Sequence, residues 1–168
     1  PGYLWKFLRL RPAAFPTLRI AQMAGLYAEH QRLFSKIAET DTIDEMQKIF
    51  DTEASVYWDS HYLFGRKGKN RKKRFGRQSI QLLLINAIIP LLHLYGENMG
   101  KEELCHRAIS FLEQLPAEKN AVVRRWAEAG VKPVNALESQ GLLQLKKAFC
   151  DEKRCLECKV GLQIIKHR

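Results

Sequence analysis

Three cysteines near the end of the sequence have a spacing that suits metal ligands. Cys150, Cys155 and Cys158 follow a C-x4-C-x2-C pattern directly after a predicted helix. Thiolates this close together on a turn can converge on one ion, and a Cys-x2-Cys pair is half of a common zinc site. The same spacing opens the plant-type iron–sulfur pattern. One interpretation of the cluster is therefore a bound zinc ion or an iron–sulfur cluster.

The cysteine cluster does not supply a fourth ligand by itself, although structural zinc normally takes four protein ligands. Candidates elsewhere in the chain are His61, His106, His167 and Cys105. Cys105 falls beside the apolar stripe of its helix, which favours a role in the core. The alternative interpretation is three reduced thiols, or a redox-labile Cys155–Cys158 pair, at the end of a helix. A metal with all four positions closed would be structural and not catalytic.

A run of basic residues points to a second kind of chemistry, which is contact with phosphate groups. The run holds no acid, and its eight cations are Arg66, Lys67, Lys69, Arg71, Lys72, Lys73, Arg74 and Arg77. Setting these eight aside reduces the net charge of the chain from +10 to +2. Clustered Arg and Lys bind phosphate backbones through counterion release. The run therefore predicts that a nucleic acid, if one is bound, contacts the chain at one place.

Residues 66–77 are expected to form a long, flexible and open loop, because glycines interrupt the run. These glycines are Gly65, Gly68 and Gly76. Proteins that bind single strands interleave aromatic side chains with cations so that bases can stack. Here only Phe75 lies inside the run, with Tyr62 and Phe64 just before it. The alternative to a nucleic-acid interface is a solvated surface loop.

The sequence shows no recognisable catalytic constellation. It lacks a Gly-rich phosphate loop, a nucleophile elbow and a metalloprotease helix motif. His61 lies among aromatic residues without a paired acid, which predicts a hydrogen-bonded structural histidine rather than a base. We therefore predict no catalytic residues, and we do not expect this chain alone to be an enzyme.

Hydrophobic periodicity and capping residues predict a helical scaffold for these features. Pro16 starts a helix, with apolar residues repeating from Ile20 to Tyr27. Further helix starts are marked by Thr42 with Glu45, by Asn120, and by Asn135 with Glu138. Residues 52–65 form an aromatic-rich segment without periodicity. The chain of 168 residues is predicted to be all-α. We expect a single-domain bundle of six or seven helices, with this irregular segment and the long basic loop.

The longest apolar stretch, Ile80 to Tyr95, has 16 residues and includes Pro90. It is shorter than the roughly 20 residues that span a bilayer, so we predict a buried core helix and no membrane contact. Four cysteines without a recognisable secretory signal favour reduced thiols and a cytoplasmic location. Because the first residue is Pro1, we expect a processed chain or, preferably, a piece of a longer protein.

Several stretches resemble the C-terminal half of an uncharacterised bacterial family, known only as a domain of unknown function. Residues 5–12 (WKFLRLRP) and 15–22 (FPTLRIAQ) resemble its start. Matching residues further along are Tyr57-Trp58, His61-Tyr62, Phe64-Gly65, Leu115 to Glu118, Asn120, Ser139-Gln140, Cys150, Cys155, Cys158 and Gly161. The basic loop departs from the family pattern, because the resemblance implies that this region varies in length and composition among family members.

The resemblance implies a longer protein in which a separate N-terminal half precedes this helical part. It implies no activity for the chain itself. Within the arm at the start, we expect Trp5, Phe7, Arg9 and Arg11 to dock the missing N-terminal half. The alternative is that the arginine stems cover the core while the guanidinium groups pair at the surface. The leading hypothesis is a non-catalytic accessory domain, with nucleic-acid binding through residues 66–77 and metal binding through the cysteines as alternatives.

Overall fold

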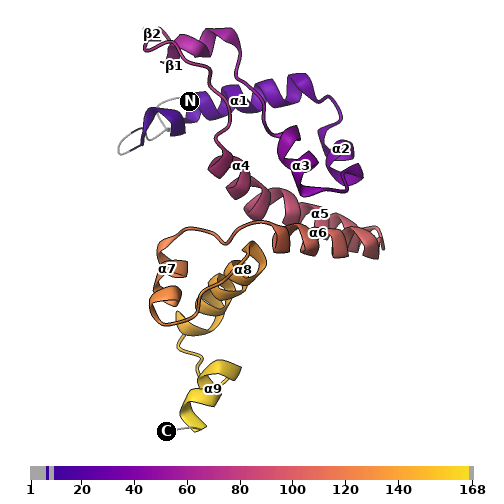
Figure 1. Cartoon of the computed structure of the whole chain (residues 1–168), viewed down its shortest axis with the longest axis vertical. Helices are drawn as coiled ribbons and strands as arrows, with labels where there is room; N and C mark the ends of the chain where they lie inside the picture. The colour runs from indigo at the N-terminus through magenta and orange to yellow at the C-terminus, as the bar shows by residue number, and fades with distance from the viewer. Residues whose placement is uncertain (1–6, 8–9, 167–168) are drawn as a thin grey trace. The chain divides into compact units, whose positions relative to one another are not determined.

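The structure, a computed structural model, describes Phe7 and residues 10–166. In this part of the chain helices predominate, and strands are confined to one short hairpin (Figure 1). The chain divides into two compact units, residues 1–88 and residues 89–168. The predicted, mostly helical fold is confirmed, whereas the single-domain bundle stays a prediction.

The first unit consists of short helices and one hairpin. Its elements are a 3-10 turn at Pro12–Ala14, α1 (Pro16–Glu29), α2 (Leu33–Glu39), α3 (Ile43–Ile49), a 3-10 helix at Val56–Ser60, β1 (His61–Leu63), β2 (Arg66–Lys67), α4 (Arg77–Leu83) and a π-helical turn at Leu84–Ile88. The predicted start of α1 is confirmed at Pro16. The predicted cap of α3 is also confirmed, because the Thr42 hydroxyl accepts a hydrogen bond from the Glu45 N–H at 3.3 Å.

Helix α1 buries a different face from the one that its apolar repeat indicates. Ile20 and Tyr27 are 53 % and 60 % exposed, while Leu18 and Leu26 are buried. The reason is the close approach of a neighbouring segment on the other side of the helix. At Gly25 a side-chain carbon would lie 2.4 Å from the backbone oxygen of Glu53, so only glycine fits there.

The aromatic-rich segment, expected to be irregular, forms part of an antiparallel hairpin. Strands β1 and β2 pair with His61 opposite Lys67 and Leu63 opposite Arg66. The connecting turn uses Gly65 at φ +69°, a conformation that favours glycine. This hairpin corrects the all-α prediction. A two-residue turn can pair two strands that are too short to show a periodic pattern in the sequence.

In the described part of the second unit the helices are joined by turns and loops, and one isolated bridge pairs Pro116 with Asn135. The elements of this unit are α5 (Ile89–Asn98), α6 (Glu102–Gln114), α7 (Ala121–Glu128), α8 (Ala136–Leu145), a π-helical turn at Lys146–Cys150 and α9 (Lys159–Lys166). The predicted caps are confirmed here as well. Asn120 accepts from the Val123 N–H and Asn135 from the Glu138 N–H, each at 2.9 Å. Helix α9, beyond the cysteines, was not predicted.

Helices α5 and α6 pack closely against each other. A side-chain carbon at Gly96 would lie 2.8 Å from the Cys105 sulfur and 3.0 Å from the Leu104 Cβ. Glycine therefore permits this approach. The buried side chains of α6 are Leu104, Ala108 and Phe111, which repeat at helical spacing along one face.

The long apolar helix differs from its prediction in length and in burial. Its helical residues run from Arg77 to Asn98, 22 residues whose most apolar 18-residue window has a mean hydropathy of 1.6, so by length and composition alone the helix could cross a membrane. Only 33 % of its most apolar window is buried. Leu82, Leu91 and Leu94 are about half exposed, so the predicted core helix buries only one side. A single helix of this kind is weak evidence for a membrane span.

Candidate functional site

The basic segment, residues 66–77, is bound along its backbone to residues 52–60. The Ala54 N–H donates to the Lys73 oxygen at 3.1 Å, and the Arg71 N–H donates to the Asp59 oxygen at 2.8 Å. The Gly68 N–H donates to the Ser60 oxygen at 2.7 Å. The expectation of an open loop is therefore corrected. Gly65 lies in the hairpin turn, Gly68 follows β2, and Gly76 directly precedes α4. The neighbouring segment supplies hydrogen-bond partners that local sequence does not reveal.

Lys73 is an internal cation that is not available to a ligand. Its side chain is 5 % exposed, and its ammonium group donates to the backbone oxygens of Asp59 and Arg71 at 2.7 and 2.9 Å. The same group lies 4.4 Å from the centre of the Tyr62 ring. A buried ammonium group is tolerated only when such acceptors replace water. Lys73 thus ties the basic segment to the hairpin.

Lys72 and Arg74 are paired with acids that precede the hairpin. The Lys72 ammonium group lies 3.1 Å from Glu53 and 3.3 Å from Asp59. Arg74 donates to Glu53 at 2.7 Å and lies 3.6 Å from Asp51. Hydrogen bonds from Arg74, and then Lys72, lower the pKa of Glu53. The same bonds raise the pKa of both cations. Three of the eight predicted cations are therefore occupied within the fold.

Two polar residues of α1 hold the basic segment from its other side. Gln22 is 1 % exposed, and its amide donates to the backbone oxygens of Lys73 and Arg74 at 3.3 and 2.9 Å. The Gln22 oxygen accepts from Arg19 at 3.0 Å. Arg19 also donates to Ser79 at 2.9 Å, and burial lowers its pKa. The sequence gives no signal for Gln22, because a single polar residue on an amphipathic helix is normally expected at the surface.

The remaining cations fall into two groups. Arg66, Lys67, Lys69 and Arg71 are exposed, and no ion pair is found for them among the residues that the structure describes. Arg77 lines a hollow of about 360 Å³ together with Asp44 and Asp51, so carboxylates lie beside it. We call the four cations, together with Phe64 at the turn, the hairpin surface. It is the part of the predicted nucleic-acid site that the fold leaves open.

Aromatic side chains support the hairpin surface from beneath. The Tyr57 ring stacks on His61 with centres 4.1 Å apart, and the Tyr57 hydroxyl accepts from the Gly65 N–H at 3.1 Å. The edge of Trp58 lies against Phe64, with ring centres 5.1 Å apart. A ring nitrogen of His61 hydrogen bonds with the Tyr57 backbone oxygen at 2.8 Å. The predicted hydrogen bonding of His61 is confirmed.

The cysteines predicted as metal ligands form no disulfide. Cys150 and Cys155 are exposed, and Cys158 is buried. Within the described residues, no group of three or more Cys, His, Asp or Glu side chains is placed to hold a metal ion. Among the candidate fourth ligands, Cys105 is half-buried against the His93 backbone oxygen at 3.6 Å and His106 is exposed. His61 is bonded within the first unit, and His167 lies outside the described residues.

The residues predicted to dock a partner are only partly described. Phe7 is half-buried and meets Phe15 edge-on, with ring centres 5.1 Å apart. Arg11 is exposed, while Trp5 and Arg9 lie outside the described residues.

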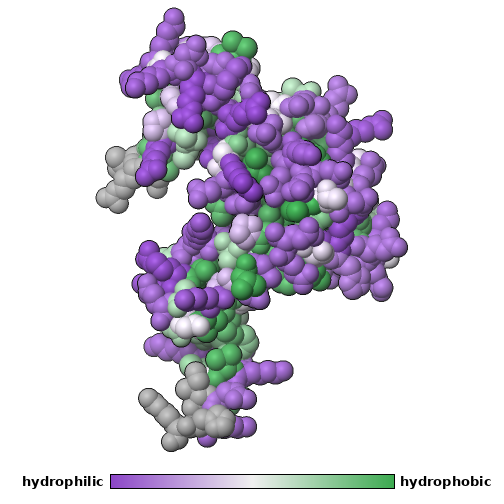
Figure 2. All heavy atoms as spheres, viewed as in Figure 1, coloured by the Kyte–Doolittle hydropathy of each residue, from purple (hydrophilic) through white to green (hydrophobic). Residues whose placement is uncertain are grey.

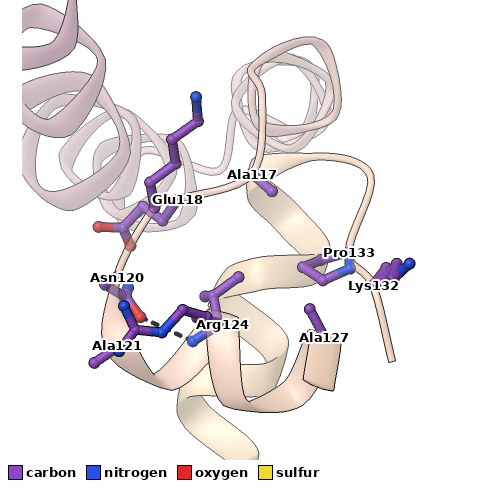
Figure 3. Close-up of a pocket in the computed structure, with 10 residues that line it drawn as sticks. Ala117, Glu118, Asn120, Ala121, Arg124, Ala127, Lys132 and Pro133 are labelled. Atoms are coloured by element: carbon purple, nitrogen blue, oxygen red, sulfur yellow. Dashed lines mark hydrogen bonds between the residues drawn. The ribbon is translucent and has the colours of Figure 1, made fainter. Parts of the chain in front are cut away.

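The second unit also has a surface pocket of about 580 Å³ (Figure 3). Its lining includes apolar side chains, among them Val123 and Pro133, and the cations Lys119, Arg124 and Lys132. Glu118 is its only carboxylate, and that group accepts a hydrogen bond from Gln140 at 2.6 Å. The pocket lining thus holds no pair of carboxylates for acid–base chemistry.

Comparison with known proteins places the chain in a family. No curated protein and no solved structure was found to match it. A model of the family described as protein of unknown function (DUF2851) matches residues 1–121. The match includes the hairpin surface and α6, and it ends before α8 and the cysteines, so the resemblance drawn from Ser139 to Gly161 lies beyond it. The chain belongs to the DUF2851 family of proteins of unknown function.

Proposed function

We propose that this chain is a non-catalytic accessory domain that packs on the rest of its own, longer polypeptide. The observation that carries this proposal is the poor burial of apolar side chains after α6. From residue 119 to residue 166, the described side chains that are buried are Val123, Ala136, Ser139 and Cys158. Such a stretch does not enclose a core of its own.

The apolar side chains of this stretch remain accessible to a partner. Val134 and Leu156 are 76 % and 71 % exposed, and Val160 and Ile165 are about half exposed. The leucines of α8 are half-buried. Figure 2 shows hydrophobic residues gathered over the part of the chain that Figure 1 labels α8 and α9. Exposed apolar patches of this kind mark interaction surfaces in soluble proteins.

The buried polar groups also support a structural role. Gln22 and Lys73 donate to backbone oxygens of the basic segment. His61 hydrogen bonds with the Tyr57 backbone oxygen in the 3-10 helix before β1. Ser139 accepts from the Glu118 N–H at 3.1 Å and donates to the Ala136 oxygen at 3.0 Å. These side chains therefore stabilise the fold. The proposed setting is a bacterial cytoplasmic protein, in keeping with the resemblance and with four unpaired cysteines.

Substitution of exposed apolar residues tests this proposal. Val134, Leu156 and Ile165, changed together to Ser, are expected to leave the melting temperature of the isolated chain almost unchanged, because these side chains already face solvent. In the longer polypeptide, the same change is expected to lower the melting temperature. Ile20→Ser is the matched control, since Ile20 is 53 % exposed on α1. Equal melting temperatures for the original and substituted longer polypeptide would overturn the proposal.

A second candidate function is nucleic-acid binding through the hairpin surface. The observation that favours it is that Arg66, Lys67, Lys69 and Arg71 stay exposed while their neighbours are paired with acids. Binding to labelled DNA or RNA that survives physiological salt supports this function. Absence of binding to any nucleic acid at low salt would contradict it.

A further inference from the structure

We infer that the ligand of the hairpin surface is single-stranded nucleic acid, with phosphates on the four cations and a base stacked on Phe64. This inference rests on the second candidate function and adds the class of nucleic acid and the contact that selects it. It follows from the position of Phe64, from the ordered backbone that carries the four cations, and from the internal contacts of Lys72, Lys73 and Arg74.

Phe64 is an unusual residue to expose at the tip of a hairpin. It is 71 % exposed, directly before the Gly65 turn and two residues before Arg66. Its ring meets the edge of Trp58 and is tilted by 31° to Tyr57, with ring centres 6.2 Å apart. These contacts orient the ring and leave most of it accessible. An oriented, open aromatic ring beside cations is the arrangement on which unpaired bases stack.

The four cations are carried by a backbone that is already ordered. Arg66 and Lys67 form β2, and the N–H groups of Gly68 and Arg71 donate to Ser60 and Asp59. Lys73 closes the other end of the segment through its three internal contacts. Because the backbone is held in this way, a ligand does not have to order the segment when it binds. Preorganisation of this kind favours affinity.

The same geometry favours a single strand over a duplex and over an acidic peptide. In a duplex the base faces are stacked on one another, so a base can stack on Phe64 only after it has been unstacked, which costs free energy. An acidic peptide can satisfy the cations but offers no base to the ring. Only an unpaired strand uses both the charges and the aromatic residue.

Internal pairing reduces the number of phosphates that this surface can neutralise. If all eight basic residues contacted a single strand, the slope of log K against log salt would be about −6. With the four residues of the hairpin surface, the expected slope is about −3. The slope thus reports whether Lys72, Lys73 and Arg74 stay in their internal contacts while the ligand is bound.

The experiment is a fluorescence-polarisation titration at several salt concentrations with the whole chain. The probes are a labelled 15-nucleotide oligo(dT), a labelled oligo(rU), a duplex of the same length, and a poly-glutamate peptide. Phe64→Leu is expected to weaken single-strand binding about 5- to 150-fold, and Phe64→Trp is expected to retain it. Phe64 is exposed, so both variants are expected to fold, which circular dichroism checks.

The matched control is a second variant with the same net charge as the first, in which four other cations are substituted. Arg66, Lys67, Lys69 and Arg71 are changed to Gln in one variant, and the exposed Lys119, Lys132, Lys147 and Lys159 are changed to Gln in the other. The first variant is expected to lose the salt dependence, and the second is expected to keep it. Equal binding of single strand and duplex, equal binding of the peptide, or no effect of Phe64→Leu would overturn the inference. Binding to no nucleic acid would remove the second candidate function itself.

Discussion

Gln22 is predicted to be the side chain on which the basic segment depends most. It is 1 % exposed, and its amide bonds to the backbone oxygens of Lys73 and Arg74 while its oxygen accepts from Arg19. Leucine has a similar volume, so Gln22→Leu removes three hydrogen bonds with little change in packing. The Lys73 oxygen keeps a second donor, the Ala54 N–H.

The expected loss of stability follows from these bonds. Each lost hydrogen bond costs about 1 kcal/mol, and the apolar replacement returns part of that sum. We expect Gln22→Leu to lower the free energy of unfolding by about 2 kcal/mol, which corresponds to a fall of about 4–8 °C in melting temperature for a chain of this size.

The assay is urea unfolding followed by circular dichroism, with thermal melts as a second readout. Gln78→Leu is the matched control, because Gln78 is exposed on α4. Its free energy of unfolding is expected to stay within about 0.5 kcal/mol of the original. A Gln22→Leu chain that is as stable as the control would refute the reasoning that α1 anchors the basic segment.

Two further predictions concern stability. Gly25→Ala places a carbon 2.4 Å from the Glu53 oxygen and is expected to destabilise the chain by about 1–3 kcal/mol. Gly141→Ala, in open space on α8, is expected to stabilise the chain by about 0.5–1 kcal/mol. Thermal melting of both variants checks these two predictions. Equal changes in melting temperature would contradict the close approach of Glu53 to Gly25. The pKa of Glu53 is lowered by Arg74 and Lys72, so its contribution is present above about pH 5 and is lost as pH falls through its folded pKa. Glu53→Gln is therefore expected to flatten the decline in melting temperature below about pH 5, and an unchanged decline would count against the ion pairs.

Local signals predicted much of the helical scaffold correctly. A helix cap depends on residues three positions apart, so Asn120 and Asn135 could be identified without knowing the fold. The hydrophobic stripe of α6 is equally local, because Leu104, Ala108 and Phe111 lie three or four positions apart in the sequence. These elements are determined by their own sequence.

The properties of the basic segment could not be predicted in the same way. Its partners are Asp51, Glu53 and Asp59, which lie 13 to 23 residues earlier in the chain, and Gln22, which lies about 50 residues earlier. Charge counting treats such a run as eight equivalent cations, although tertiary contacts occupy three of them. The buried face of α1 was missed for a related reason, since Gly25 gives no hydrophobic signal and yet marks the closest contact.

Hydrogen exchange in α8 and α9 tests the proposed accessory role most directly. The measurement compares backbone amides of residues 134–166 in the isolated chain and in the longer polypeptide. If the exposed apolar residues, among them Val134, Leu156 and Ile165, are covered by the rest of the polypeptide, these amides are expected to exchange at least about 10-fold more slowly in the longer protein. Equal exchange rates in the two proteins would contradict the proposal.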